Sequence, residues 1–432
     1  MSIIQKVENV IKFIDVLSAN KQYTKTPYSL VKEMLDQIPD NIWQDKSKKF
    51  YDPCMGRGIF LLECFRRLMI GLESTIPDEL DRAKYIANQM LYGSDIESLQ
   101  YDYTVKSFEK ILADVEPNFF IKDILEEYNL EMKFDVICGN PPYNESTTSD
   151  KHSTKQKGQK ATWTSFVDKS WEMLSDDGYL VYVTPNNWLR ETNYLKEVIK
   201  SKNLVCARID SDNIKKNYFP TVGSTFTWFV IKNSNKDTDP KMYIGERGGL
   251  KLLDISLEDI IPQKDLDETS LSIFRKVFKN STSGIAGVWV RQNEINEKYH
   301  SVQKTNTHIY RALYSGNKKN MYRWLSAPTS TANNHKAVIY RSSASDVFYD
   351  YDNSTTDNVY CCVCDSKAEA EHYVKVMNTD LYKFLIKNTK SAGAIVSVIN
   401  KIPLVPYGTQ EDEYQFFGLT QEEIDYVKER SK

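Results

Sequence analysis

The stretch that decides the fold is FDVICGNPPYN, residues Phe134–Asn144. Its mainly apolar run up to Cys138, with β-branched residues at the centre, predicts a short buried strand. Gly139 permits a sharp turn, and the two prolines that follow Asn140 fix φ and remove backbone donors. The sequence therefore predicts an α/β fold with a rigid loop at the carboxyl end of a strand, where open α/β sheets bind their ligands.

This loop has the groups needed to activate a planar nitrogen. The side-chain carbonyl of Asn140 and the peptide carbonyl of Pro141 are two neighbouring acceptors. Together they would bind both protons of one NH2 group, draw its lone pair out of conjugation and favour methyl transfer from a sulfonium donor. Tyr143 adds a ring on which a flat substrate can stack. A proline-stiffened strand exit without chemistry is the alternative, and the structural context distinguishes the two.

Composition limits the classes of protein to be considered. The 432 residues are enough for two domains, and the contents of hydrophobic residues (41%) and charged residues (27%) are ordinary for a globular protein. The net charge is −3, so any contact with nucleic acid has to come from local basic patches. The chain has no apolar run of transmembrane length and no signal-peptide pattern, so we expect a soluble, cytoplasmic protein.

The seven cysteines do not form a disulfide pattern. Cys361, Cys362 and Cys364 lie in the alternating stretch NVYCCVCD, without a second pair or a histidine at ligand spacing. We interpret them as strand residues of a reduced protein and expect no metal site.

A second informative stretch is FYDPCMGRGIF, residues 50–60. A strand is predicted to end at Asp52, glycines follow at 56 and 58, and an apolar helix runs from Ile59 to Met69. Glycines in a strand-to-helix turn let a ligand approach the backbone closely. The spacing is not GxGxxG and no P-loop lysine follows, which favours a nucleotide-like ligand without a pyrophosphate.

Acidic residues follow two further predicted strands. MLYGSDIES indicates a strand that ends in Asp95, a position suited to ribose hydroxyls, and NFFIKDIL supplies Asp123. Taken singly, such residues are more often turn or cap residues, but their order between the glycine turn and Asn140 favours a ligand site. Upstream, Thr26 is expected to cap a helix with Pro27 at its first position.

The segments KTPYSL, DPCMGRG, YGSDIE, KDIL and NPPY, in this order, resemble the gamma group of N6-adenine DNA methyltransferases, the TaqI-type enzymes. The resemblance continues through ATWTSFVDKSWEMLSDDGYLVYVTPNNWL and YFPTVGSTFTWFVIK, where Phe219 is the leading aromatic residue. It implies a Rossmann-like, S-adenosylmethionine-dependent methyltransferase domain over residues 1–240. A smaller α+β target recognition domain that binds double-stranded DNA would follow over residues 241–432.

The resemblance also implies two sets of site residues. S-adenosylmethionine would be held by Thr26, Pro27, Asp52, Gly56, Gly58, Asp95 and Asp123. A flipped adenine would be held by Asn140, Pro141, Pro142, Tyr143 and Phe219. In the first set, Thr26 and Pro27 would lie near the methionine part, Asp95 at the ribose and Asp123 at the adenine amine of the cofactor.

Two stretches combine basic residues with features suited to DNA. Residues 144–162 are rich in Ser, Thr, Lys and Gln, and their lysines at 151, 155, 157 and 160 would either meet phosphates or belong to a solvated loop. THIYRALYSGNKKNMYRWLS interleaves basic residues with aromatic ones, namely Lys318, Lys319 and Arg323 with Tyr310, Tyr314, Tyr322 and Trp324. This mixture suits phosphate and base contacts, although a packing surface would have a similar composition.

Other functions stay open at this point. The Asn-Pro-Pro-Tyr loop also suits a cytosine amine, an RNA base or a protein glutamine, and a catalytically silent DNA specificity subunit is an alternative of another class. The roughly 190 residues after the cofactor fold favour a sequence-reading domain, and the intact site residues disfavour the silent subunit. We therefore expect a monomeric, site-specific DNA adenine methyltransferase of restriction–modification or phage and host DNA protection, with or without a cognate endonuclease.

Overall fold

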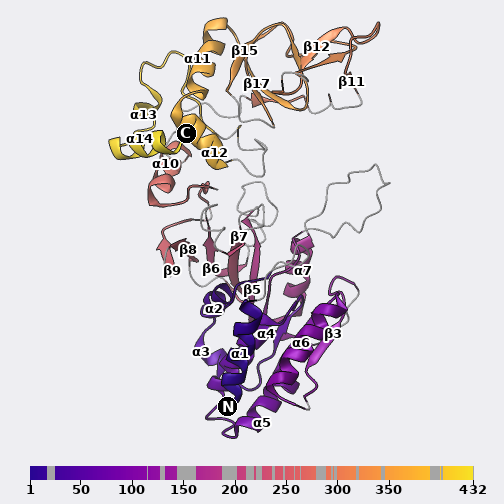
Figure 1. The fold of residues 1–432 in the computed structure, drawn as a ribbon. Coiled ribbons are helices and arrows are strands. Elements are labelled where there is room, and N and C mark those ends of the chain that lie inside the picture. The colour runs from indigo at the N-terminus through magenta and orange to yellow at the C-terminus, as the bar shows by residue number, and fades with distance from the viewer. Residues whose placement is uncertain are drawn as a thin grey trace. The chain divides into compact units, whose positions relative to one another are not determined.

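The computed structural model describes two compact units, the first up to Asp254 and the second from Ile255 (Figure 1). Neither unit is placed relative to the other, so each is described by itself. The described residues are 1–16, 25–113, 115–126, 132–143, 162–186, 202–210, 218–219, 226–235, 239–246, 249–256, 258–262, 264–278, 289–292, 295, 299–317, 321–341, 346–389, 399 and 402–431. Within these ranges no helix is both long enough and apolar enough to cross a membrane.

A nine-stranded sheet forms the centre of the first unit, in the order β3-β2-β1-β4-β5-β7-β6-β8-β9. The strands are β1 Phe50–Asp52, β2 Leu91–Asp95, β3 Asn118–Ile121, β4 Phe134–Gly139, β5 Leu174–Pro185, β6 Asn203–Ile209, β7 Phe226–Lys232, β8 Lys241–Glu246 and β9 Gly249–Leu253. Neighbours from β3 to β5 run parallel, whereas β7 is antiparallel to both β5 and β6. The strand order reverses direction at β1 and β4, which is where doubly wound sheets bind ligands. The prediction of a Rossmann-like α/β fold is confirmed.

Helices cover both faces of this sheet. They are α1 Ile3–Val16, α2 Tyr28–Leu35, α3 Asp40–Trp43, α4 Ile59–Gly71, α5 Glu79–Tyr85, α6 Ser98–Ile111 and α7 Thr162–Met173, with a π-turn, η1 Ile86–Met90, after α5. Helix α1 packs on α4 and α6, and its buried Val7 belongs to the same core as Val181 of β5. Tyr182 points to the opposite face, because side chains alternate along a strand. There its hydroxyl lies 2.5 Å from Ser170 Oγ of α7.

The second unit combines two small sheets with helices. One sheet has the order β10-β17-β14-β15 and the other β11-β13-β12-β16. Their strands are β10 Trp289–Val290, β11 His300–Ser301, β12 Tyr310–Leu313, β13 Tyr322–Leu325, β14 His335–Tyr340, β15 Phe348–Asp350, β16 Ser354–Thr355 and β17 Val359–Cys364. The helices are α10 Glu268–Phe278, α11 Lys367–Met377, α12 Asp380–Thr389, α13 Glu413–Phe416 and α14 Gln421–Arg430. The β10–β17–β14–β15 sheet shares a buried apolar core with these helices. This unit is therefore α+β.

Local predictions are mostly confirmed, with one error near the carboxyl end. The three clustered cysteines lie in β17, and a capping box of Thr420 and Glu423 begins α14. The resemblance to the TaqI-type enzymes also implies a proline-bounded strand in INKIPLVPYG and a short capped helix in FFGLTQEEIDYVKER. The strand is wrong, because only an isolated bridge forms at Leu404. Prolines at 403 and 406 lack the N–H groups that a ladder needs. The hydroxyl of Tyr382 takes the place of ladder hydrogen bonds to this backbone. It donates to Pro403 O at 2.7 Å and accepts from Val405 N–H at 3.2 Å.

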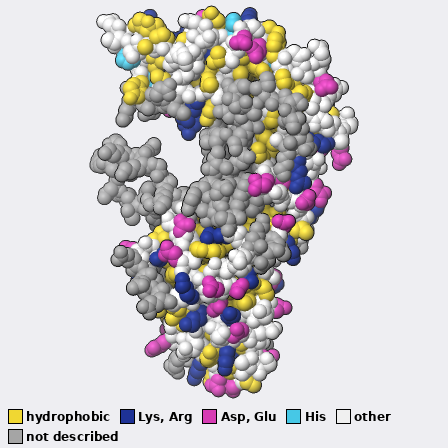
Figure 2. Space-filling view, turned by 180° about the vertical axis from the view of Figure 1, so that it is seen from behind, with side chains coloured by type: hydrophobic (Ala, Val, Ile, Leu, Met, Phe, Trp, Pro, Cys, Tyr) yellow, Lys and Arg dark blue, Asp and Glu magenta, His cyan; other side chains and the backbone are white. Residues whose placement is uncertain are grey.

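The visible surface of the first unit carries charges of both signs. In the lower part of Figure 2, Lys and Arg side chains of described residues are interspersed with Asp and Glu. This mixture agrees with the small net charge of −3.

Candidate active site

Four predicted site residues lie at the carboxyl ends of adjacent strands. Asp52 ends β1, Asp95 ends β2, and Asn140 follows the last residue of β4, while Asp123 lies two residues after β3. These strands are parallel neighbours, so their ends share one edge of the sheet. The structure therefore brings together residues that are up to 88 positions apart in the sequence (140 minus 52).

The turn between β1 and α4 depends on backbone geometry. Gly56 and Gly58 have φ values of 52° and 77°, in the left-handed region that favours glycine. The Gly56 N–H donates to Asp95 Oδ2 at 2.9 Å, and Thr104 Oγ1 of α6 donates to Gly56 O at 2.8 Å. A Cβ on Gly58 would lie 2.7 Å from Thr104 Cγ2. Thr104 was not predicted, because a threonine within a helix gives no signal in the sequence for such a contact.

Asp52 is a buried acid beneath the end of β4. Its side chain is 1% exposed, and its Oδ1 accepts a hydrogen bond from Cys54 N–H at 3.1 Å. Burial raises the pKa of the Asp52 carboxyl to about 8, and the neighbouring Asp95 carboxylate contributes to this rise. A Cβ on Gly139 would lie 2.7 Å from Asp52 Oδ1, so the loop strand can lie this close to the acid only because residue 139 is glycine.

Replacing Asp52 by asparagine is expected to flatten the pH dependence of stability of the ligand-free protein. The pKa of this carboxyl rises from 3.8 to about 8 on folding, so between these values the folded state binds more protons than the unfolded state. The free energy of unfolding therefore falls as the pH increases through this window. At about 1.4 kcal/mol per pKa unit, the total loss is on the order of 6 kcal/mol. Urea unfolding at about pH 5, 7 and 9 measures the effect.

The variant should gain stability relative to the natural protein as the pH rises. Asp78→Asn is a matched control, because Asp78 is an exposed cap that accepts from Asp81 N–H at 2.8 Å. Parallel pH curves for the Asp52 variant and the natural protein would contradict the predicted protonation of Asp52.

The position of Thr26 corrects one expectation. Helix α2 begins at Tyr28, and its capping residue Pro27 makes no side-chain cap, so Thr26 is not the helix cap. The buried Thr26 hydroxyl instead accepts a hydrogen bond from Asn140 Nδ2 at 3.0 Å. Because the amide nitrogen donates one of its two protons to Thr26, the amide oxygen is the acceptor that Asn140 offers to a ligand.

The other loop residues and Phe219 differ in how far they are buried at this edge of the sheet. Pro141 is buried, Pro142 is exposed and Tyr143 is half-buried. Burial raises the pKa of the Tyr143 hydroxyl, which therefore stays protonated. Phe219 is 3% exposed and packs edge-on against Phe226, with ring centroids 4.9 Å apart.

Phe226 is the first residue of β7, and it pairs with Pro185 at the carboxyl end of β5. Phe219 thus packs at the edge that carries Asn140.

Asp123 lies at the same edge of the sheet, and its side chain accepts a hydrogen bond from its own turn. It is half-buried, and its Oδ1 accepts from Leu125 N–H at 2.8 Å, as in an Asx turn. The backbone beside it is fixed to β2, because Lys122 N–H donates to Asp95 O at 2.9 Å. The acid is therefore held in place next to Asp95.

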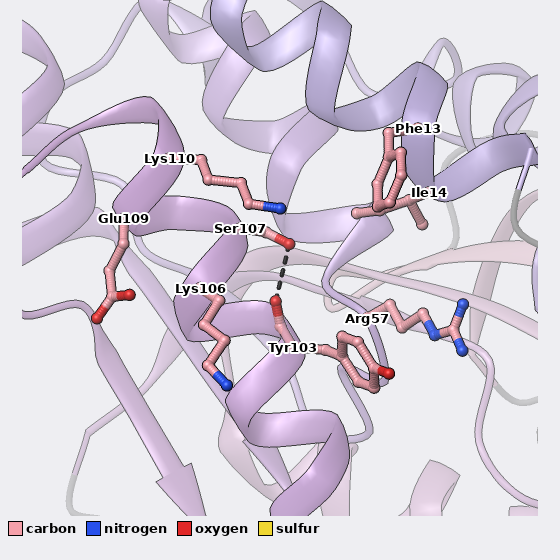
Figure 3. A pocket seen from close by; sticks show the side chains of 8 residues that line it. All are labelled: Phe13, Ile14, Arg57, Tyr103, Lys106, Ser107, Glu109 and Lys110. Atoms are coloured by element: carbon pink, nitrogen blue, oxygen red, sulfur yellow. Dashed lines mark hydrogen bonds between the residues drawn. The ribbon is translucent and has the colours of Figure 1, made fainter.

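An open pocket of about 440 Å³ lies beside the glycine turn, between α1 and α6 (Figure 3). Two cationic side chains of the pocket lie over aromatic rings. The Arg57 guanidinium lies 5.0 Å from the ring centroid of Tyr103, and Lys110 Nζ lies 5.3 Å from the ring centroid of Phe13. Arg57 thus leaves the glycine turn toward α6, whereas Met55, 2% exposed, packs into the core.

Some predicted residues lie outside the described residues. These are the lysines at 151, 155, 157 and 160, together with Lys318 and Lys319. Across the ranges that the structure does describe, no group of three His, Cys, Asp or Glu side chains could hold a metal ion.

Comparison with known proteins gives one family match and two curated relatives. Residues 66–215 match the family described as Eco57I restriction-modification methylase. An uncharacterised adenine-specific methylase of Mycoplasma pneumoniae is 23% identical over 62% of this chain and 80% of its own length. The type II methyltransferase M.VspI of Vibrio sp. (strain 343) is 25% identical over 39% of this chain and 38% of its own length. This chain therefore spans well under half of the Vibrio enzyme.

Solved structures share the fold. A nuclease-deletion mutant of the type ISP restriction-modification enzyme LlaGI, in complex with a DNA substrate mimic, aligns with a TM-score of 0.54 at 12% identity, over 94% of this chain and 46% of that chain. The DrdV–DNA complex aligns with a TM-score of 0.52 at 12% identity, over 94% and 56%. At such identities the similarity establishes the fold alone.

Proposed function

We propose that this chain is a site-specific DNA adenine methyltransferase, which transfers a methyl group from S-adenosylmethionine to the exocyclic nitrogen of a flipped adenine. The observation that carries the proposal is Asn140, held by Thr26 at the end of β4 beside Asp52 and Asp95. The family match and the two curated relatives, one named as an adenine-specific methylase and the other as a type II methyltransferase, support methyl transfer.

The acids at the sheet edge fit S-adenosylmethionine. The Asp95 carboxylate accepts backbone N–H groups, from Gly56 at 2.9 Å and from Glu97 at 3.0 Å. A carboxylate has about four acceptor positions, so it can also accept from the ribose hydroxyls. The Asp95 carboxylate supplies negative potential for a ligand that carries a sulfonium and an ammonium group. These positive charges would lower the raised pKa of Asp52 and so favour its ionised form when the ligand is bound. When bound, this cofactor supplies an already activated methyl group.

The loop residues act on the base. Asn140 Oδ1 and the carbonyl oxygen of Pro141 accept the two protons of the target amine and turn its lone pair toward the methyl group. Tyr143 stacks on one face of the base and Phe219 closes the other. These contacts hold the two reacting atoms in line, which is the main contribution that a protein can make to such a transfer.

Replacing Asp95 by alanine is expected to weaken cofactor binding by about 1.5–3 kcal/mol, the usual contribution of hydrogen bonds to a charged group. Two ribose hydroxyls would lose their acceptor, and Gly56 N–H would lose the bond that holds the glycine turn. Titration calorimetry with S-adenosylmethionine measures the change. Asp78→Ala is the control, because it removes a carboxylate that also binds a backbone N–H but lies at α5. Equal affinities for the Asp95 variant and the natural protein would remove Asp95 from the cofactor site.

The second unit provides the DNA-recognition surface in this proposal. The pairing of β12 with β13 sets Arg311 opposite Trp324 and Leu313 opposite Tyr322, so these side chains share one face. The Arg311 guanidinium lies 4.6 Å from the Tyr322 centroid, and Lys304 Nζ lies 5.3 Å from that of Trp324.

Arg323 lies on the other face of this sheet, 3.8 Å from the Tyr314 centroid, and Tyr310 is exposed. Cations interleaved with rings suit contacts to phosphates and bases.

Lys304→Ala is expected to weaken DNA binding at low salt to a similar degree on every sequence. The side chain is exposed, and losing one phosphate contact should reduce the slope of log affinity against log salt by about 0.9. Fluorescence anisotropy over a salt series measures the slope. Lys428→Ala on α14 is the control, because this exposed lysine also lies near a ring, 6.0 Å from the Tyr414 centroid. An unchanged slope for Lys304→Ala would exclude this lysine from the DNA contact.

The experiment that tests the proposed function is expression in bacteria that lack adenine methylases. Single-molecule sequencing of their genome should show N6-methyladenine at one short, fixed sequence, and none with the Asn140→Ala variant. Modified cytosine at a fixed site would move the assignment to the cytosine amine. An unmodified genome with transfer to RNA or protein would overturn the DNA assignment, and no transfer at all would favour a silent specificity subunit.

A further inference from the structure

One arginine in the first unit is almost completely buried among acids. Arg208 of β6 is 1% exposed. Its Nη1–H donates to Glu33 Oε1 at 2.5 Å, and its Nε–H donates to Asp210 Oδ1 at 2.9 Å. Burial of a cation is unfavourable unless partners of opposite charge surround it closely. Here two carboxylates surround one guanidinium.

These acids tie the arginine to three further elements. Glu33 belongs to α2, and its Oε1 also accepts from Trp228 Nε1–H of β7 at 2.8 Å. Asp210 Oδ1 also accepts from Gly245 N–H of β8 at 2.9 Å. Gly245 is required here, because a Cβ at this position would overlap the Arg208 guanidinium. A single cation thus joins α2 to strands β6, β7 and β8.

The same guanidinium contacts the residue next to Phe219. Its Nη1–H donates to the Tyr218 hydroxyl at 3.3 Å, and its carbon lies 4.8 Å from the Tyr218 ring centroid. Tyr218 packs on Phe226 with ring centroids 5.8 Å apart, and Phe219 packs on the same ring. Arg208 therefore fixes the aromatic pair that ends in Phe219.

At its other end this network reaches Asn140. Helix α2, which carries Glu33, begins directly after Thr26 and Pro27, and Thr26 accepts the hydrogen bond from Asn140. We propose that Arg208 is a positioning residue for methyl transfer, which sets the separation between Asn140 and Phe219 on the two sides of the target base. This inference rests on the proposed function.

A merely structural role is distinguishable from positioning. Replacing a whole buried ion pair by apolar side chains is often close to neutral for stability. Stability alone therefore does not explain why this protein has the ion-pair network around Arg208. A positioning role predicts that the rate of the chemical step falls while cofactor affinity stays constant. A displacement of about 1 Å at a reacting centre can cost roughly 100-fold in rate.

Three variants test the proposal in the full-length protein. Arg208→Met removes the charge, Tyr218→Phe removes only the hydroxyl that accepts from Arg208, and Arg82→Met is the matched control. Arg82 is also buried, 4% exposed, but it donates to the carbonyl oxygens of Ile76 and Pro77 before α5. The readouts are single-turnover methylation, calorimetric affinity for S-adenosylmethionine, and fluorescence of DNA with 2-aminopurine at the target position.

We expect Arg208→Met to lower the single-turnover rate by about 100-fold, with cofactor affinity within about twofold and altered 2-aminopurine fluorescence. Tyr218→Phe should change the same readouts less, and Arg82→Met should change none of them. Equal rates for Arg208→Met and Arg82→Met, or a fall in cofactor affinity as large as the fall in rate, would overturn the inference.

If Arg208→Met does not fold, the variants Tyr218→Phe and Glu33→Gln test the proposal in its place. Single-turnover methylation at the natural rate in both variants would overturn the inference. A natural protein that methylates no DNA would overturn the proposed function as well. An active natural protein with unaffected variants would overturn the positioning role alone.

Discussion

Asn140→Ala is expected to abolish detectable methyl transfer, with a loss of at least about 100- to 1,000-fold, while cofactor affinity stays within about twofold. The alanine removes the oxygen that would accept a proton of the target amine, and it leaves the acids Asp52 and Asp95 unchanged. It also frees the Thr26 hydroxyl, which accepts from Asn140 Nδ2 at 3.0 Å. Single-turnover methylation and calorimetry with S-adenosylmethionine measure the two quantities.

Two further variants make this experiment specific. Thr26→Val keeps the shape of residue 26 but leaves the Asn140 amide unsupported, so it should lower the rate less than Asn140→Ala does. Asn118→Ala is the control, because Asn118 Nδ2 donates to Asn88 O at 2.8 Å away from the loop. A loss of cofactor binding in Asn140→Ala would show that this loop is a structural part of the cofactor pocket and not a base-binding one.

The parallel strands and the acids at their ends could be predicted because their signals are local. Each of β1, β2 and β4 is a short stretch that begins with an apolar residue and stops at aspartate or glycine, and parallel strands place such ends at one edge. The prediction of Asp52, Asp95 and Asn140 as neighbours required only the order of these runs. The cysteines of β17 were predicted for the same reason, since alternation is visible within six residues.

Contacts across long sequence separations could not be predicted from the sequence. Thr26 and Asn140 are 114 residues apart, and Glu33 and Arg208 are 175 apart. A threonine before a proline has the local pattern of a helix cap, and this pattern led to the prediction for Thr26. In the structure Thr26 instead accepts a hydrogen bond from Asn140 in the loop. Arginine and glutamate are mostly exposed in proteins, and the sequence gives no sign that Arg208 is buried.

The extension of the sheet by β8 and β9 was also not apparent. The polar stretch at 233–240 resembles a linker, and the strands that follow it are short. Strand β8 pairs with β6, and β9 pairs with β8, through main-chain bonds, which depend on the backbone and not on a side-chain pattern. The first compact unit therefore reaches Asp254.

Gly139→Ala is expected to reduce both cofactor affinity and methylation, unlike Asn140→Ala at the next position. The new Cβ would lie 2.7 Å from Asp52 Oδ1 and 3.2 Å from Cys54 Sγ. Both atoms belong to the buried turn that leads to the glycines at 56 and 58, so the carboxylate cannot move into solvent and the backbone has to shift. Overpacking of this kind costs about 1–3 kcal/mol, which corresponds to a loss of roughly 5- to 150-fold in affinity if the strain falls on the bound state.

Calorimetry and single-turnover assays on this variant should therefore show losses in both quantities. Val136→Ala is the matched control, because Val136 is a fully buried residue of the same strand and its truncation leaves a cavity without touching Asp52. If Gly139→Ala and Val136→Ala lose stability alike but neither loses cofactor affinity, the close approach of β4 to Asp52 has no role in the cofactor site. If only Gly139→Ala loses affinity, one glycine without a side chain connects the base-binding loop to the buried acid of the cofactor pocket.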